Sequence, residues 1–394
     1  MARPVDVAPS GPLALPITGL GQGWEAAALM TLTVVLLSLG LVTLYSASAF
    51  LAQRQMLPDY YYVVRQATGA AIGLSALGVC AWLPHDVWER LAWPMVVVAW
   101  LLLVVLVIPG TEAIAPEING ARRWIRFGVT LQPSELAKMA VLVWTASLAV
   151  RKQEHFQSLK RGLVPFLVVW GAIMLPVYLE PDLSTAVLIG LLGLVVVFAA
   201  GARMAHFAFL GLFALPVLWR QLAVSFRADR VAAFLDPSAD PAGAGFQVHQ
   251  SLLALGSGGI AGVGFGQGRQ KLGFLPEAHN DFIFAMIGEE WGLVGVTVTV
   301  ALYMLLVLVG YRVAARAPDL FGQLLATGIT SMIALQALLH MSVGLSLVPP
   351  TGLALPLVSY GRSNLLMTLA ALGILMSISR VCERPLPVGR RARA

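Results

Sequence analysis

Charged residues are scarce in this sequence. They make up 12% of its 394 residues, whereas 58% are hydrophobic. Soluble proteins contain about 25% charged residues, so this chain has too few to cover a globular surface of its size. Lipid must therefore be the solvent over much of the surface. This conclusion overrides the two or three soluble domains that length alone would suggest and indicates one membrane domain.

Cysteine and histidine are also rare. Cys80 and Cys382 are the two cysteines and offer neither a disulfide framework nor a metal cluster, and the six histidines are scattered. The net charge of +6 comes without the long basic run that is typical of nucleic-acid binding, so no nucleic-acid partner is predicted. Residues 1–24 lack the features of a signal peptide and predict a flexible cytoplasmic tail. The glycine-rich stretch 256–271 fits no nucleotide-binding motif, and no organic cofactor is expected.

Long apolar runs occupy most of the chain. A membrane-spanning helix needs roughly 17–25 mostly apolar residues, and backbone hydrogen bonding in lipid requires such runs to be helical. The ten candidate spans are residues 26–50, 64–83, 91–109, 134–150, 163–178, 183–200, 205–222, 282–310, 320–345 and 363–380. The prediction is an all-α integral membrane protein, with about ten transmembrane helices in a domain covering residues 25–382.

Basic residues predict the orientation of these helices. Loop 151–161 and the tail 383–394 are strongly basic, and the positive-inside rule places both in the cytoplasm. Ten spans put both termini on that side. Loops 110–133 and 223–281 then lie outside, and the second, between helices seven and eight, is far too long for a simple connector. An anionic ligand would explain the outer-loop cations, which are Arg122, Arg123, Arg126, Arg227, Arg230, Arg269 and Lys271.

A third outer segment, residues 348–361, is apolar but interrupted by prolines and glycines. Apolar sequence that cannot form a continuous helix is typical of a re-entrant segment lining a cavity. It runs into SYGRSN at 359–364, which opens the last helix. Backbone N–H groups there suit a phosphate, and Arg362 adds positive charge. Ordinary helix capping explains the same residues equally well.

Asp281 is the candidate catalytic residue. It lies in FLPEAHNDFIFAMIGEEWG, residues 274–292, at the start of an apolar helix. Lipid limits hydration at the membrane surface, so a carboxylate there can be tuned as a general base. The alternative is helix capping, because Asp is among the best N-cap residues. Glu289 and Glu290, deeper in the same helix, are costly in a membrane and are either functional or fix helix packing.

A second polar group lies in residues 118–140. Arg122 and Arg123 suit bidentate contacts with phosphate, and Trp124 suits the membrane interface. Anchoring of the arginines at the membrane surface is an equal alternative. Glu135 and Lys138 are three residues apart and share a helical face as an expected ion pair. The spacing does not decide whether that pair serves the structure or the substrate.

Ordered motifs across residues 40–380 resemble the SEDS family (shape, elongation, division and sporulation), and within it the FtsW branch. The motifs are YSAS at 45–48, GARRWI at 120–125, QPSELAK at 132–138, EPDLST at 180–185, FLDPSADPAGAGFQVHQSLLALGSGG at 234–259, GVGFGQGRQKLGFLPEAHNDFIFAMIGEE at 262–290 and PPTGLALPLVSYGRSN at 349–364. Gly288 in the IGEE block and the RQK at 269–271 resemble the division branch more than the elongation branch, RodA.

The resemblance implies a peptidoglycan glycosyltransferase that polymerises lipid II, an undecaprenyl-diphosphate-linked disaccharide-peptide, on the outer face of the bacterial inner membrane. The essential loop aspartate of the family falls on Asp281. Expected partners are a class B penicillin-binding protein and other division proteins, and a divalent cation, Mg²⁺ or Mn²⁺, is a candidate cofactor. The candidate substrate-binding residues are Arg122, Arg123, Trp124, Glu135, Lys138, Asp182, Arg269, Lys271, His279, Ser359 and Tyr360.

The chain departs from the family pattern in the same outer motifs. Glu180 stands where Gln is usual, Ser184 where Gly is usual, and His340 where Asn is commoner. SYGRSN replaces the usual SYGGSS, so Arg362 and Asn364 are unusual as well. These differences concern the outer polar segments and not the pattern of spans.

Two other functions fit the same architecture. A lipid II flippase or transporter would use intramembrane acids equally well, but alternating access requires cavities that open to both sides of the membrane. The polar motifs here gather on the outer side, which favours an enzyme. A non-catalytic scaffold for division proteins would not need Asp281.

Overall fold

The computed structural model describes residues 23–117, 120–127, 129–156, 158–222, 224, 228, 231–232, 234 and 244–382. Each of the ten predicted spans corresponds to a helix in this part of the chain. The helices are α1 (Trp24–Arg54), α2 (Tyr61–Trp82), α3 (Asp86–Val107), α4 (Pro133–Lys152), α5 (Val164–Leu179), α6 (Leu183–Ala199), α7 (Met204–Leu222), α10 (Ile283–Arg316), α11 (Leu320–Gly344) and α12 (Arg362–Cys382). The all-α class is therefore confirmed.

Length and composition qualify most of these helices as membrane spans. Seven spans in the described residues are long and apolar enough, namely α1, α2, α3, α5 with its preceding turn, α10, α11 and α12. Helix α6 is apolar but has only 17 residues. Helix α4 is buried along nearly its whole length, and Glu135 and Lys138 lie in its first two turns. The chain is a multi-pass membrane protein, and the number of ten crossings stays a prediction.

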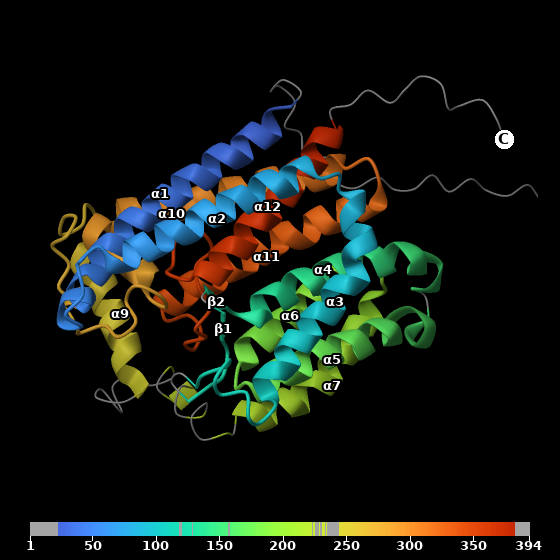
Figure 1. Cartoon of the computed structure of the whole chain (residues 1–394), viewed down its shortest axis with the longest axis horizontal. Coiled ribbons are helices and arrows are strands. Elements are labelled where there is room, and N and C mark those ends of the chain that lie inside the picture. The colour runs from blue at the N-terminus through green and yellow to red at the C-terminus, as the bar shows by residue number, and fades with distance from the viewer. Residues whose placement is uncertain are drawn as a thin grey trace, which may run out of the picture.

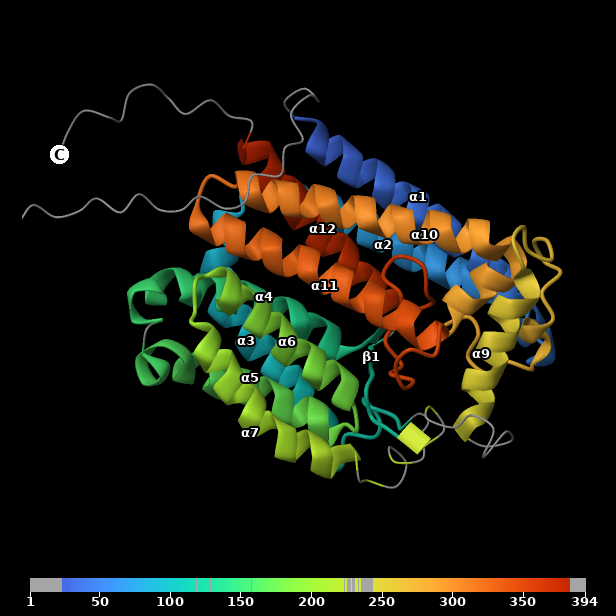
Figure 2. The same cartoon turned by 180° about the vertical axis from the view of Figure 1, so that it is seen from behind.

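The helices form two groups that meet at α11 (Figures 1 and 2). Helices α1, α2, α10 and α12 make one group, and α3 to α7 make the other. Helix α2 packs along α12, α10 along α11, and α3 along α4. The approach of α2 to α12 is very close, because a Cβ at Gly373 would lie 2.4 Å from the Leu77 carbonyl oxygen. The start of α1 and the end of α12 lie at the same end of the bundle (Figure 1).

The predicted re-entrant segment, residues 348–361, is non-helical, and residues 355–359 within it are buried. The Tyr303 hydroxyl donates a hydrogen bond to the Pro356 carbonyl oxygen, and the His340 Nδ1 lies 2.8 Å from the Leu353 carbonyl oxygen. A Cβ on Gly40 of α1 would lie 2.7 Å from the Leu357 carbonyl oxygen. Irregular backbone is tolerated at this depth because neighbouring helices, and not lipid, surround it.

The two long loops, residues 110–133 and 223–281, contain more regular structure than the sequence suggested. Loop 110–133 ends in a short hairpin of β1 (Ile125–Phe127) and β2 (Val129–Leu131), in which Ile125 pairs with Leu131. Loop 223–281 is not irregular throughout, since it contains helix α9 (Ala244–Gly258), which packs on α10. Arg227, Arg230 and the tail 383–394 lie outside the described residues.

Candidate active site

A cavity of about 740 Å³ lies between the two helix groups. Its walls come from the hairpin loop, α4, the turn before α6, residues 277–282, the re-entrant segment and the starts of α2 and α12. Motifs from five distant parts of the sequence therefore meet at one site. The sequence-predicted residues that line it are Arg123, Trp124, Glu135, Lys138, Asp182, His279, Asp281 and Tyr360.

Asp281 occupies the wall formed by the loop before α10. Helix α10 begins at Ile283, and Phe282, its N-cap residue, makes no side-chain capping hydrogen bond. Asp281 lies one residue earlier, so it does not hold the N-cap position that the capping interpretation requires. Its backbone N–H donates to the Glu277 carbonyl oxygen at 2.9 Å. A Cβ on Gly352 would lie 3.8 Å from Asp281 Oδ2, which puts the carboxylate beside the backbone of the re-entrant segment.

The predicted ion pair on α4 is present and almost completely buried. Lys138 Nζ donates to Glu135 Oε1 at 2.8 Å. Asn364 of α12 donates to the other oxygen of the same carboxylate at 3.1 Å. The unusual Asn364 thus joins α12 to α4 across the cavity wall. Since Glu135 neutralises Lys138, this pair contributes hydrogen-bonding groups to the cavity and little net charge.

Arg123 and Asp182 organise the opposite wall at the turn between α5 and α6. Arg123 donates to the Glu180 carbonyl oxygen at 3.3 Å and to the Pro181 carbonyl oxygen at 2.8 Å. Asp182 caps α6, because its side chain accepts from the Thr185 N–H at 3.2 Å and from the Thr185 hydroxyl at 2.9 Å. Both side chains also face the cavity. Arg123 makes no ion pair in the described part of the chain, so its charge is available to an anion.

Three of the predicted substrate-binding cations do not line the cavity. Arg122 forms an ion pair with Glu112 at 2.8 Å. Arg269 is exposed, and its backbone N–H donates to Glu289 Oε1 at 2.7 Å. Lys271 is part of a buried contact with Glu290 at 2.8 Å. The sequence reveals the charge of Arg122 and Lys271 but not the carboxylates with which they pair. A contact of these three cations with a diphosphate stays a prediction.

Ser359 also serves the structure. Its hydroxyl donates to the Asn280 carbonyl oxygen at 2.8 Å and accepts from the Leu355 N–H at 2.9 Å. The bond to Asn280 fastens the re-entrant segment to the loop that carries Asp281, whereas the bond from Leu355 lies within the segment. Glu289 and Glu290 likewise accept hydrogen bonds from residues 269–271 and from Ser46, which supports the packing interpretation of the two acids.

An aromatic cluster borders the cavity beside His279. The His279 ring lies 5.2 Å from the ring of Tyr62 and 5.6 Å from that of Tyr360. Burial lowers the pKa of His279, and the nearby Glu277 carboxylate opposes this shift. The imidazole is therefore neutral at pH 7 and suited to hydrogen bonding with an uncharged sugar. Sequence reasoning missed Tyr62, because a tyrosine at the start of an apolar span has no distinguishing signal.

Glu180, unusual for the family, is buried beside the cavity at 3% exposure, and neither carboxylate oxygen has a hydrogen-bond partner in the described chain. Burial raises its pKa from 4.5 to about 9, helped by Asp182 and opposed by Arg123. Between pH 4.5 and about pH 9, the Glu180 carboxyl loses its proton in the unfolded chain but keeps it in the folded chain. The stability present below pH 4.5 is therefore lost progressively as the pH rises to about 9.

Glu180→Gln removes this ionisation and keeps the side-chain shape. We expect the variant to be more stable than the unmodified protein above neutral pH, with the difference shrinking toward about pH 5. Thermal denaturation in detergent across that range measures the effect. A stability difference independent of pH would contradict the assignment.

The described residues offer no group of three His, Cys, Asp or Glu side chains that could hold a metal ion. A divalent cation at this site would need most of its ligands from a bound substrate. The side chains in the described part of the chain do not form a metal site by themselves.

The family model described as "Cell cycle protein", FTSW_RODA_SPOVE, matches residues 27–384. The chain belongs to this family. A relative from Geobacter sulfurreducens, named "Probable peptidoglycan glycosyltransferase FtsW", is 40% identical over 353 residues, which cover 89% of this chain and 94% of the relative. The "Stage V sporulation protein E" of Bacillus subtilis is also 40% identical, over 89% of this chain and 96% of its own length.

Solved structures share the fold. A chain from a structure described as "Structural coordination of polymerization and crosslinking by a peptidoglycan synthase complex" has a TM-score of 0.74 and 32% identity, covering 92% of this chain and 99% of its own. RodA of Thermus thermophilus has a TM-score of 0.65 and 29% identity, and the match covers 92% of this chain and 97% of RodA. The family resemblance drawn from the ordered motifs is therefore confirmed.

Proposed function

We propose that this chain is a peptidoglycan glycosyltransferase that polymerises lipid II, with Asp281 as the general base. The observation that carries the proposal is the position of Asp281, which faces a polar cavity bounded by lipid-embedded helices. Relatives that match 89% of the chain are named as peptidoglycan glycosyltransferases, which supports this reaction class. The FtsW name of those relatives supports a role in cell division.

The chemistry assigns roles to groups in the cavity. The 4-hydroxyl of the acceptor GlcNAc attacks the anomeric carbon of the donor MurNAc, and Asp281 takes the hydroxyl proton. The bond from that carbon to the diphosphate breaks, and undecaprenyl diphosphate leaves with the bonding electrons. Arg123 stabilises the charge that develops on this leaving group. A single displacement converts the α-linked donor into a β-linked product with inversion.

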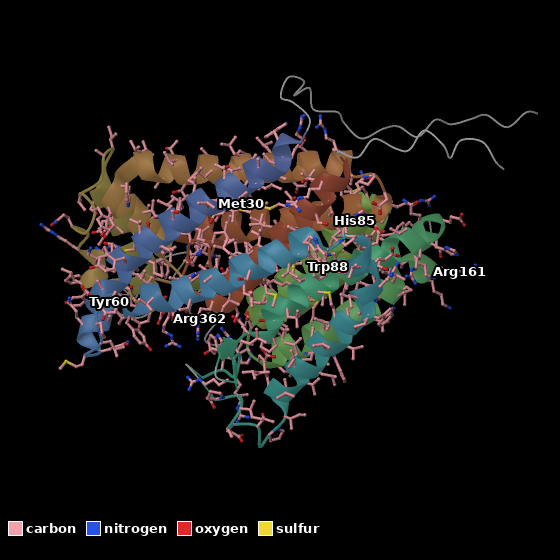
Figure 3. All side chains as sticks on the ribbon, turned by 45° about the horizontal axis from the view of Figure 1, so that its top comes forward. Met30, Tyr60, His85, Trp88, Arg161 and Arg362 are labelled. Carbon is pink, nitrogen blue, oxygen red and sulfur yellow. The ribbon has the colours of Figure 1, made fainter. Side chains whose placement is uncertain are left out.

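Lipid II requires a site that both water and lipid can reach. Its isoprenoid tail stays in the membrane, while its sugars and peptide stay in water. The basic loop near Arg161 lies at one end of the molecule, and Tyr60 lies at the other (Figure 3). By the positive-inside rule the Arg161 end is cytoplasmic. We therefore place the protein in the cytoplasmic membrane, with both termini inside and the cavity facing outward.

The proposed orientation predicts two reporter results. A reporter fused to the C-terminus is expected to read cytoplasmic, and one inserted after Ala113, in the exposed loop before the hairpin, is expected to read external. Alkaline phosphatase and fluorescent-protein fusions measure the two positions. The opposite pattern would contradict the reaction scheme, since the cavity would then face the wrong compartment.

A class B penicillin-binding protein is the proposed partner, because the similar solved chain belongs to a complex described as coordinating polymerisation and crosslinking. Such a partner would crosslink the glycan made here. Other division proteins are proposed to join the same assembly.

The decisive test of the proposed function is the reaction of purified protein with lipid II, in the presence of the partner. Polymerisation gives long glycan chains in detergent. A flippase would instead move lipid II across a vesicle membrane and leave it monomeric, and a scaffold would do neither. The absence of glycan chains together with transfer across vesicles would replace our proposal with the flippase.

Arg122 and Arg123 form a matched pair for testing the anion contact. Arg123→Gln removes a charge from the cavity. It is expected to lower kcat/KM for lipid II by a factor that corresponds to about 1.5–3 kcal/mol, the range for hydrogen bonds to charged groups. Arg122→Gln breaks only a partly exposed pair with Glu112 and is expected to change activity little. Steady-state kinetics with lipid II measures both variants. Equal losses would contradict the cavity assignment.

A further inference from the structure

Two arginines that the proposed mechanism leaves unused face the cavity from α2 and α12. Arg65 and Arg362 both line it. The positive charges of both act on the Tyr360 side chain, so the two arginines stand at the same end of the cavity. Figure 3 labels Arg362 on the side of the bundle along which α2 runs. Arg362 is unusual for the family, whereas Arg65 lies at the start of an apolar span and has no distinguishing signal in the sequence.

Neither arginine has a carboxylate within ion-pair distance in the part of the chain that the structure describes. Arg65 Nη1 donates to the Tyr61 hydroxyl at 2.6 Å and its guanidinium stacks 5.3 Å from the Tyr61 ring. Arg362 Nη2 donates to the Thr130 hydroxyl at 3.2 Å. Glu277 lines the same cavity without pairing with either arginine. Two like charges at one end of a cavity would be stabilised by an anionic ligand.

The side chain of Arg362 packs against helix α2 at Gly69. A Cβ on Gly69 would lie 2.9 Å from Arg362 Cγ and 3.3 Å from Arg362 Cβ, so the stem of the arginine rests where Gly69 has no side chain. Arg362 is also the first residue of α12, where the helix dipole favours negative charge. The space left by the absent side chain of Gly69 is therefore filled by the side chain of Arg362.

We propose that Arg65 and Arg362 form a subsite for the diphosphate of one of the two lipid substrates. This inference rests on the proposed function, in which two diphosphate-linked lipids must occupy the cavity together. Guanidinium groups bind phosphate oxygens in a bidentate manner, which suits them to this ligand better than to neutral sugar. Arg123 lies on another wall, at the α5–α6 turn, where it donates to the Pro181 carbonyl oxygen.

Kinetics of lipid II polymerisation tests the subsite. Arg362→Gln and Arg65→Gln are each expected to raise KM about tenfold, the effect of losing one charge-assisted hydrogen bond. Arg362→Lys keeps the charge and is expected to show a smaller rise. Gly69→Ala leaves every charge in place but displaces the arginine stem, so it is expected to raise KM as well, by less. Arg151→Gln, at an exposed pair with Glu89, is the control and is expected to leave KM unchanged.

Product inhibition distinguishes whether the bound diphosphate belongs to the donor or to the acceptor lipid II. Undecaprenyl diphosphate is the leaving group of the donor. If Arg362→Gln raises KM and also weakens inhibition by undecaprenyl diphosphate about tenfold, the subsite binds the donor. If KM rises and this inhibition is unchanged, the subsite binds the acceptor. Unchanged KM and unchanged inhibition in both the Arg65 and Arg362 variants would overturn the subsite.

A binding measurement separates failure of this inference from failure of the proposed function. Thermal stabilisation of the purified protein by lipid II, compared with uncharged undecaprenol, requires no turnover. If the unmodified protein binds lipid II but does not polymerise it, the proposed function fails. Lipid II binding weakened about tenfold by Arg362→Gln would still support the subsite, and binding equal to that of the unmodified protein would overturn it.

Discussion

Replacement of Asp281 by asparagine is expected to lower glycan polymerisation at least about a hundredfold, because general-base catalysis contributes about 10²–10⁴-fold. Asparagine has nearly the same size and shape but cannot accept the proton of the GlcNAc hydroxyl. Asp281 lies before the N-cap position of α10, so the substitution is not expected to weaken that helix. Asp281→Asn is therefore expected to remain folded and to bind lipid II.

The matched control is Asp182→Asn. Asp182 lines the same cavity but caps α6 through Thr185, and Asn caps helices as well as Asp does. We expect this variant to retain far more activity than Asp281→Asn, because it keeps the cap on α6 and does not remove the proposed base. Chain formation from lipid II, with the partner present, measures both variants, and thermal denaturation checks their folding. Near-normal glycan synthesis by Asp281→Asn would eliminate the general-base role but not the membrane architecture.

The helices were predictable from sequence because a run of apolar residues has few alternatives to a helix in lipid. The same reasoning found the re-entrant segment, since prolines and glycines between 348 and 361 break a helix while the residues remain apolar. Helix α9 was missed because its 15 residues are too short for a membrane span and lie within a long loop. The hairpin strands have three residues each, too few for a periodic pattern.

The site was predictable only in part. Asp281 and Arg123 were singled out as charged groups at the membrane surface, and the Glu135–Lys138 pair by its three-residue spacing. The family resemblance pointed to Asp281 as the base. The residues that surround these side chains were not predicted, because cavity walls are built from residues far apart in sequence. Gln66, for example, accepts from the Gly361 N–H of the re-entrant segment and donates to its Ser359 carbonyl oxygen.

Lys271 is another residue whose partner could not be read from the sequence. Its sequence position suggested a diphosphate contact, but Lys271 Nζ donates to Glu290 Oε1 at 2.8 Å and to Ser46 Oγ at 2.7 Å. Glu290 is only 2% exposed. The chain reverses between these residues, and Gly292, at φ 65°, bends α10 just after the carboxylate. Lys271 therefore supplies the counter-charge for an acid buried at the junction of α1 and α10.

Lys271→Met is expected to destabilise the protein by about 3–5 kcal/mol, because removing one partner leaves a buried charge uncompensated. Lys271→Met combined with Glu290→Met removes both charges and is expected to recover most of this loss. Arg269→Gln is the control: its exposed side chain is expected to contribute less than about 0.5 kcal/mol. Denaturation in detergent measures the free energies of unfolding, and lipid II kinetics is followed on the same samples. If Lys271→Met unfolds like the unmodified protein but has a raised KM for lipid II, Lys271 binds substrate, and the structural role assigned to it here is wrong.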